Sequence, residues 1–179
     1  MVENLRKNIG IRLAQFKFRK KLYPETTFNN AYTHARSILI IVPENIEHRS
    51  QANSLLTTLY NRFRGNKMTI IAPISTHVLP TSMTQCSIIP LSQQQLNFFF
   101  LPKTQSIEKL FAEKFDILID LNFSIIPLAA YICRGITAKL KIGFVKDDAD
   151  IFYNFQLQTT NTKTPKLQYE FLHRTLTMF

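Results

Sequence analysis

Residues 115–121 read Phe-Asp-Ile-Leu-Ile-Asp-Leu, a short run of β-branched and other apolar residues interrupted by two aspartates. A run of this length and composition is typical of a strand that is buried on both faces of a parallel sheet. Further runs of the same kind occupy residues 38–42, 68–72 and 139–144. We therefore expect at least four buried strands.

Segments between and after these runs repeat apolar residues at helical spacing. They cover residues 46–64, 104–114, 124–135 and 165–178. The pattern also allows strands at 87–90, 97–101 and 151–157. Strands that alternate with helices imply right-handed crossovers and a mainly parallel sheet. The sequence thus predicts a three-layer α/β, Rossmann-like domain over residues 37–179.

Residues 1–36 differ in composition from the rest. They hold eight Lys or Arg and two acidic residues, a net charge of +6 out of +10 for the whole chain. Within them Leu5, Ile9, Leu13 and Phe16 recur at spacings that place them on one face of a helix. We expect a basic amphipathic helix over residues 3–21, in an N-terminal arm that precedes the domain and ends before it at residue 36.

The cations of this arm are candidates for anion binding, because like charges on one helix favour a counter-charge. They are Arg6, Lys7, Arg12, Lys17, Arg19, Lys20 and Lys21. Three interpretations stay open. The helix packs on the domain through its apolar face, or it contacts RNA such as ribosomal RNA, or it lies on an anionic membrane surface.

Length and composition limit the alternatives. The chain has 179 residues, of which 45% are hydrophobic, as in an ordinary globular domain. Its two cysteines, Cys86 and Cys133, show no metal-ligand spacing, so we expect two reduced, buried thiols. No apolar run reaches the length of a membrane span, and basic residues interrupt every apolar stretch near the N-terminus. We expect a cytoplasmic protein, with peripheral association at the inner membrane face as an alternative.

Three segments together resemble the N-terminal lobe of the heptosyltransferase-type glycosyltransferases of family 9. They are residues 115–122, 128–135 and 139–144, about 30 residues in all. That lobe has a strand reading D-x-x-I-D-L, a helix rich in Ala and Leu, and a strand ending I-G-F. The resemblance implies a half-fold that lacks the lobe for the sugar donor. It also implies, for an enzyme, a lipopolysaccharide-like acceptor.

The sequence departs from that family after the first strand. Family members have a glycine-containing turn and an aspartate there, which serve acceptor binding and base catalysis. This chain has Pro-Glu-Asn-Ile-Glu-His-Arg-Ser at residues 43–50. Glu44 and Glu47 are therefore candidates for the replaced aspartate, and His48, which lies near the same crevice, is a further catalytic candidate.

Asp120 is a further catalytic candidate, because it lies near the carboxyl end of a predicted central strand, where parallel sheets bind ligands. The alternative is a structural carboxylate that caps the next helix or pairs with Arg134 or a lysine. Asp116 lies four residues earlier in the same predicted strand, so its side chain is expected on the same face of the sheet as that of Asp120.

Several kinds of site are excluded or disfavoured. The chain has four glycines and no glycine-rich phosphate loop, so we expect no dinucleotide and no other cofactor. Asp147, Asp148 and Asp150 are interpreted as a solvated turn and not as a metal site. The remaining histidines, His34, His77 and His173, are interpreted as surface or packing residues. The run of three phenylalanines at residues 98–100 is interpreted as core on both faces of a strand, and not as a surface for base stacking.

Two functions follow from these patterns. The first is a non-catalytic, single-domain binding module that docks through its basic helix on RNA or on a membrane surface. The alternative is a glycosyltransferase-related lobe or subunit, completed by a partner chain that carries the donor lobe. A protein partner or a homo-oligomer also stays open.

Overall fold

A computed structural model describes residues 2–20, 27–72, 83–159 and 164–178. Within them a single sheet has the strand order β3-β2-β1-β4-β5-β6, and every neighbouring pair is parallel. The strands are β1 (Ser37–Ile41), β2 (Lys67–Ala72), β3 (Ser87–Pro90), β4 (Lys114–Asp120), β5 (Thr137–Phe144) and β6 (Phe155–Leu157). The predicted Rossmann-like α/β fold is confirmed.

Six helices accompany the sheet in the described ranges. They are α1 (Val2–Lys17), α2 (Phe28–Thr33), α3 (Ile46–Arg62), α4 (Thr104–Ala112), α5 (Pro127–Gly135) and α6 (Pro165–Thr177). Single 3₁₀ turns occupy Gln93–Gln95 and Ala149–Ile151. None of these helices has the length and apolar character needed to cross a bilayer.

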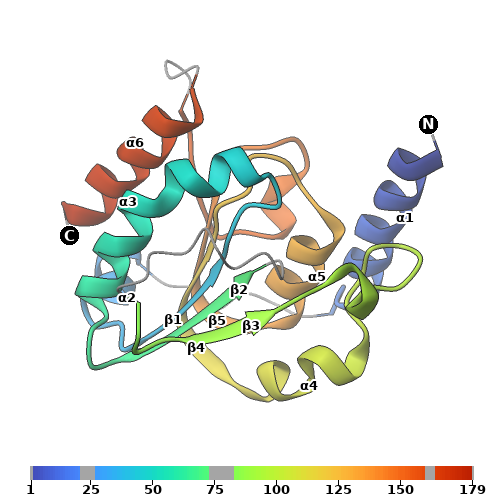
Figure 1. The fold of residues 1–179 in the computed structure, drawn as a ribbon, viewed down its shortest axis with the longest axis horizontal. Coiled ribbons are helices and arrows are strands. Elements are labelled where there is room, and N and C mark those ends of the chain that lie inside the picture. The colour runs from blue at the N-terminus through green and yellow to red at the C-terminus, as the bar shows by residue number, and fades with distance from the viewer. Residues whose placement is uncertain (1, 21–26, 73–82, 160–163, 179) are drawn as a thin grey trace.

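The helices form a layer on each side of the sheet, with α2, α3 and α6 on one face and α1, α4 and α5 on the other (Figure 1). Side chains of β1 alternate between the two layers. Ile38 and Ile40 pack with α3, whereas Leu39 and Ile41 pack with α5. This alternation is why continuous apolar runs, and not alternating ones, encode the central strands.

Local sequence signals set the ends of the helices. Asn45 caps α3, since its side-chain oxygen accepts hydrogen bonds from the backbone N–H groups of Glu47 and His48. Pro127 begins α5, where its missing N–H costs nothing. Gly65 turns the chain after α3 with φ of +80°.

Several segments differ from expectation. The strand expected at residues 151–157 is shorter, since β6 covers Phe155–Leu157. Helix α1 ends at Lys17 and is followed by a turn at residues 18–20, so it is shorter than the predicted 3–21, and Lys21 lies outside the described residues. The short helix α2 was not predicted. The division of the chain at residue 36 stays a prediction.

The expected strand at residues 97–101 is wrong, because this segment forms a tight turn. The side-chain oxygen of Asn97 accepts hydrogen bonds from the backbone N–H groups of Phe99 and Leu101. Phe100 adopts φ of 59°, a left-handed conformation that a strand does not contain. As a result, Phe98 is exposed, which contradicts its interpretation as a core residue.

Helix α1 packs on the domain through Gly10 and Ala14, with Ile11 partly buried beside them, whereas Leu5, Leu13 and Phe16 are exposed. The buried residues of α1 are Gly10 and Ala14. A Cβ atom on Gly10 would lie 2.2 Å from the carbonyl oxygen of Phe99 and 3.0 Å from the Cβ of Pro127. Of the three interpretations left open, packing through the face of Leu5, Ile9, Leu13 and Phe16 is therefore wrong, because only Ile9 among them is partly buried.

Two polar contacts secure this helix–helix contact. Lys17 donates a hydrogen bond to the hydroxyl of Tyr131 on α5. Arg134, at the end of α5, donates a hydrogen bond of 2.7 Å to the carbonyl oxygen of Phe18. Hydrogen bonds at the C-terminal end of α1 thus add to the close contact that Gly10 and Ala14 make near its centre.

Gly10→Val should lower the free energy of unfolding by about 1–3 kcal/mol, because the new side chain meets backbone atoms that do not yield easily. Asn8→Val is the matched control, since it places the same side chain at an exposed position of α1 and should change stability by less than about 0.5 kcal/mol. Urea unfolding followed by circular dichroism measures both. Equal stabilities of the two variants would contradict the packing described here.

Candidate functional site

The carboxyl ends of the central strands form one edge of the sheet. β1 and β4 are neighbours at its centre, and the chain leads from β1 to β2 and β3 on one side and from β4 to β5 and β6 on the other. Open α/β sheets bind ligands at this kind of switch point, outside the carboxyl ends of the strands. The residues that follow β1 and β4 are therefore the first candidates for a site.

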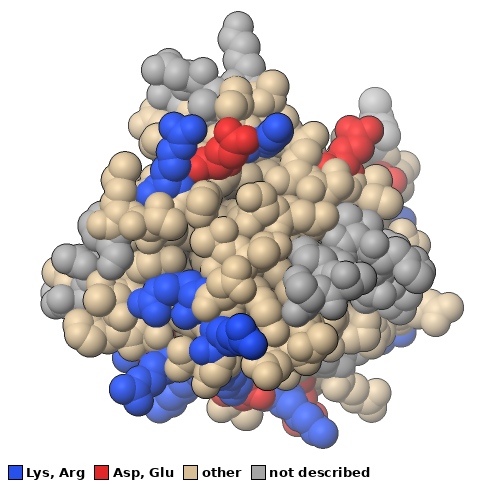
Figure 2. Space-filling view, turned by 60° about the vertical axis from the view of Figure 1, so that its left-hand side comes forward, with Lys and Arg blue, Asp and Glu red and all other residues tan. Residues whose placement is uncertain are grey.

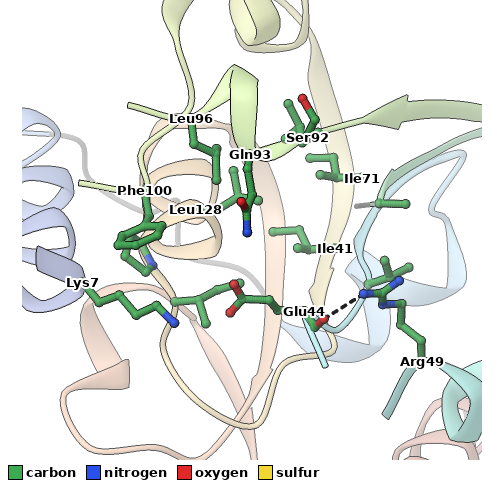
Figure 3. Close-up of a pocket in the computed structure, with 15 residues that line it drawn as sticks. Lys7, Ile41, Glu44, Arg49, Ile71, Ser92, Gln93, Leu96, Phe100 and Leu128 are labelled. Carbon is green, nitrogen blue, oxygen red and sulfur yellow. Dashed lines mark hydrogen bonds between the residues drawn. The ribbon is translucent and has the colours of Figure 1, made fainter. Parts of the chain in front are cut away.

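A pocket of about 370 Å³ lies at this edge, over the ends of β1, β2 and β3 (Figure 3). We call it the edge pocket. Its apolar lining residues are Ile41, Val42, Ile71, Ala72, Leu91, Leu96, Phe100, Ile126, Pro127 and Leu128. Its polar lining residues are Lys7, Glu44, Arg49, Ser92 and Gln93. A concave, mostly apolar cavity with a few polar groups is the usual form of a small-molecule site.

Charged side chains from three segments meet at the mouth of the edge pocket. Lys7 reaches it from α1 and Glu44 from the turn between β1 and α3, and the two side chains extend toward one another (Figure 3). Lys7 also forms an ion pair of 3.0 Å with Glu3 on its own helix. The mouth therefore combines a cation and a carboxylate on opposite sides.

Arg49 supplies a second cation and also shapes the turn that carries Glu44. Its side chain donates hydrogen bonds of 2.9 Å to the carbonyl oxygen of Pro43 and 2.8 Å to that of Glu44. Burial lowers the pKa of Arg49, and the charge of Glu44 opposes this effect. A guanidinium does not lose its proton in proteins, so a positive charge is held at the pocket wall.

A fully buried carboxylate, that of Asp120, lies behind the mouth. One of its oxygens accepts hydrogen bonds from the backbone and side chain of Asn122, and the other accepts from Lys146 at 3.1 Å and from the hydroxyl of Tyr153. The side-chain oxygen of Asn122 in turn accepts a hydrogen bond of 2.8 Å from the backbone N–H of Glu44. A continuous set of hydrogen bonds thus connects the segment after β5 to the turn that carries Glu44.

Burial and the charge of Asp120 raise the pKa of Tyr153 well above its usual value, so its hydroxyl keeps its proton and acts as a donor. Burial likewise raises the pKa of the Cys133 thiol. The ring of Tyr153 lies against Gly143, where a Cβ atom would come within 2.8 Å of it. The glycine of the I-G-F strand end therefore makes room for this tyrosine.

The structure separates the catalytic candidates. Glu44 lines the edge pocket, whereas Asp120 is buried in the network with Lys146, the lysine pairing that was its structural alternative. His48 is half-buried, lies edge-on to the ring of Phe123 and borders a neighbouring hollow that shares Glu44. Glu47 is exposed in the first turn of α3 and lines neither cavity.

Asp116 lies at the opposite, amino end of β4. Burial alone would raise its pKa, but hydrogen bonds from Lys139, from the N–H of Arg36 and from Ser37 lower it overall. Asp116 therefore joins β1 to β4 and takes no part in the edge pocket.

The acidic cluster, the histidines and the cysteines do not form a metal site within the described residues. Asp147, Asp148 and Asp150 are exposed, as expected of a solvated turn. In the ranges that the structure describes, no group of three or more His, Cys, Asp or Glu residues is arranged to hold a metal ion. His77 lies outside those ranges. Both thiols are free, but Cys86 is only partly buried.

The cations of the N-terminal helix contact several different partners. The guanidinium of Arg6 lies 4.0 Å from the ring centre of Phe98, and that of Arg19 lies 4.4 Å from the ring centre of Phe16. Arg12 borders a hollow that also contains Asp147 and Asp148, and Lys20 is exposed. Only Lys7 reaches the edge pocket among the described cations of the arm.

Sequence reasoning missed Arg49, Ser92 and Gln93. Arg49 lies within the candidate stretch at residues 43–50, so its position next to His48 was the available signal. Ser92 and Gln93 follow the edge strand β3 and carried no signal of their own. They reach the pocket because β3 ends next to β2.

Comparisons with known proteins agree with this fold. A family model described as "Family of unknown function (DUF6913)" matches residues 12–179. The solved structure of E. coli heptosyltransferase WaaC with ADP is similar with a TM-score of 0.57 and 18% identity, over 78% of this chain and 46% of that one. The same enzyme with ADP-2-deoxy-2-fluoro heptose gives a TM-score of 0.59 and 14% identity, over 80% and 49%. No curated protein matches.

The chain thus spans about half the length of the solved structures that it matches. The likeness confirms the half-fold resembling the N-terminal lobe that the sequence suggested.

Lys146→Met should lower the free energy of unfolding by about 3–5 kcal/mol, because it leaves the charge of Asp120 buried without its counter-charge. Lys139→Met is the matched control. It breaks the ion pair with Asp116, in which the lysine side chain is 66% exposed, and should cost less than about 1 kcal/mol. Chemical denaturation at neutral pH compares the two variants. Similar losses would show that the Asp120 network does not have the stabilising role described.

Proposed function

We propose that this chain, which belongs to the DUF6913 family of unknown function, is a single-lobed binding protein for an acidic saccharide. By this we mean a sugar that carries a phosphate or a carboxylate. The observation that supports the proposal most directly is the edge pocket, in which Lys7 and Arg49 place positive charge at an apolar cavity beside the Glu44 carboxylate.

The apolar wall of the pocket supports a ligand with a carbon skeleton. Leu96, Phe100 and Leu128 offer surface to the C–H groups of a sugar ring or to an attached apolar group. The volume of about 370 Å³ lies near the lower end of the range for small-molecule sites, roughly 300–1,000 Å³. A bare inorganic anion would leave most of this surface without contact.

The polar groups support hydroxyl and anion recognition together. Glu44, Ser92 and Gln93 supply acceptors and donors for hydroxyl groups, while Lys7 and Arg49 complement an anionic substituent. Glu44 and the Glu3 partner of Lys7 offset part of this positive charge, so the preference for an anionic sugar rests on direct contact of its anionic group with Lys7 and Arg49 at the cavity wall.

Likeness to a glycosyltransferase lobe supports the sugar class. The matched structures are named for a heptosyltransferase and contain ADP or an ADP-heptose analogue. In this reading the chain corresponds to one lobe, and glycosyl transfer would need a donor lobe from a partner chain. Two reactants held in one geometry are a requirement of such a transfer.

Glycosyl transfer is therefore the second candidate function, and the position of Glu44 favours it. Glu44 lies in the turn after β1, where the resemblance implies a carboxylate that serves as base toward the acceptor. In that role Glu44 would accept the proton of the attacking hydroxyl.

Titration calorimetry with hexose and heptose phosphates tests the binding proposal, with the parent sugars and inorganic phosphate as comparisons. At least one sugar phosphate should bind about tenfold more tightly than inorganic phosphate, because both the pocket wall and the cations contribute. The variants Glu44→Gln and Lys7→Met should weaken this binding, since each removes a charged group from the mouth.

Two controls match these variants. Glu47→Gln and Lys20→Met remove the same types of charge from exposed positions outside the pocket and should leave affinity unchanged. If no sugar phosphate binds better than phosphate, or if the controls weaken binding as much as the pocket variants, the proposal is wrong.

A further inference from the structure

We propose that helix α1 docks the protein on an anionic lipid surface through its outward face. The residues of this outer face are Val2, Leu5, Leu13 and Phe16 of α1, together with Phe98 of the adjoining turn. The proposal is independent of the edge pocket, which lies on the inner side of the helix.

The outer face is an exposed apolar surface. Leu5, Phe16 and Phe98 are 62%, 64% and 63% exposed. Arg6 joins the two segments, because it donates a hydrogen bond of 2.9 Å to the carbonyl oxygen of Phe98 and covers one side of that ring. Leu13 and Phe16 border a shallow hollow whose far side is the same turn and the start of α4.

The fold itself does not require this apolar face. Gly10 and Ala14 provide the inward contact of α1, so polar residues at Leu5 or Phe16 would leave that contact intact. Contiguous exposed apolar surface on a globular domain commonly marks an interaction site.

The charges around the outer face indicate what covers it. At 100° per residue, Arg6 lies on one side of the Leu5–Phe16 stripe and Arg12 on the other. Arg19 lies over the ring of Phe16, and the single acidic residue of α1, Glu3, pairs with Lys7. An apolar stripe between cations is the pattern of helices that lie in the interface of anionic membranes.

The aliphatic residues favour lipid over RNA. Val2, Leu5 and Leu13 gain free energy when they leave water for the acyl region of a bilayer, but they have no counterpart in the phosphate backbone of RNA. Figure 2 shows that another face of the molecule also carries Lys and Arg, but these are scattered among other residues. Positive charge alone therefore does not distinguish α1 from the rest of the surface. What distinguishes α1 is the combination of positive charge with an exposed apolar stripe.

Co-sedimentation with lipid vesicles tests the proposal. The full chain should bind vesicles that contain phosphatidylglycerol and bind pure phosphatidylcholine vesicles weakly, and added salt should reduce the difference. Absence of binding to the phosphatidylglycerol vesicles at low salt would overturn the proposal.

Substitutions on the outer face should reduce vesicle binding while the fold is kept. Phe16→Glu and Leu5→Glu should each lower the partition coefficient by about tenfold or more, because a buried apolar side chain is lost and a negative charge is added. Phe171→Glu is the matched control; it makes the same change at a 43% exposed position of α6, on the other side of the sheet, and should have a much smaller effect. Melting temperatures check that all three variants fold.

Light scattering and RNA titration test the two other possible partners of the outer face, which are a second copy of the chain and RNA. A dimer that Phe16→Glu converts to a monomer would assign the outer face to a second copy and would overturn the proposal. RNA binding that matches vesicle binding in strength and is lost with Phe16→Glu would do the same. A monomeric protein whose RNA binding is unaffected by Phe16→Glu would support the lipid surface.

Discussion

The buried carboxylate of Asp120 is the constraint on which the architecture of the candidate site depends. A charge that is excluded from water is tolerated only when a counter-charge and hydrogen bonds replace its hydration. Lys146, Tyr153 and Asn122 provide these partners from segments that follow β5 and β4. Because Asn122 also binds the backbone of Glu44, the carboxyl ends of β1, β4 and β5 are fixed around one charged group.

Much of the fold could be predicted because the central strands are buried on both faces. Such strands appear in the sequence as continuous apolar runs. The two main errors have local causes. The side-chain oxygen of Asn97 accepts hydrogen bonds from two backbone N–H groups and so stabilises a turn. This turn outweighs the preference of the following phenylalanines for a strand. For α1, large apolar residues suggested the packing face, but Gly10 and Ala14 allow the closer approach to α5.

The site was only partly predictable. Glu44 and Asp120 were found because they stand at the ends of recognisable strands, and position along a strand is encoded locally. Their different environments were not encoded locally, since burial of Asp120 depends on Tyr153, 33 residues away, and on the space that Gly143 leaves for its ring. The edge pocket also needs Lys7, which reaches it only because of how α1 packs.

The contact of Gly10 and Ala14 with the domain has a consequence for how this helix can diverge. Since Gly10 and Ala14 make the closest contact, the exposed positions of α1, such as Leu5 and Phe16, can change chemical character without disturbing that contact. Substitutions on the exposed face of α1 can therefore change what this face binds, while the buried face still places Lys7 at the edge pocket. The outer face of α1 and the edge pocket can thus evolve separately, although both depend on the same helix.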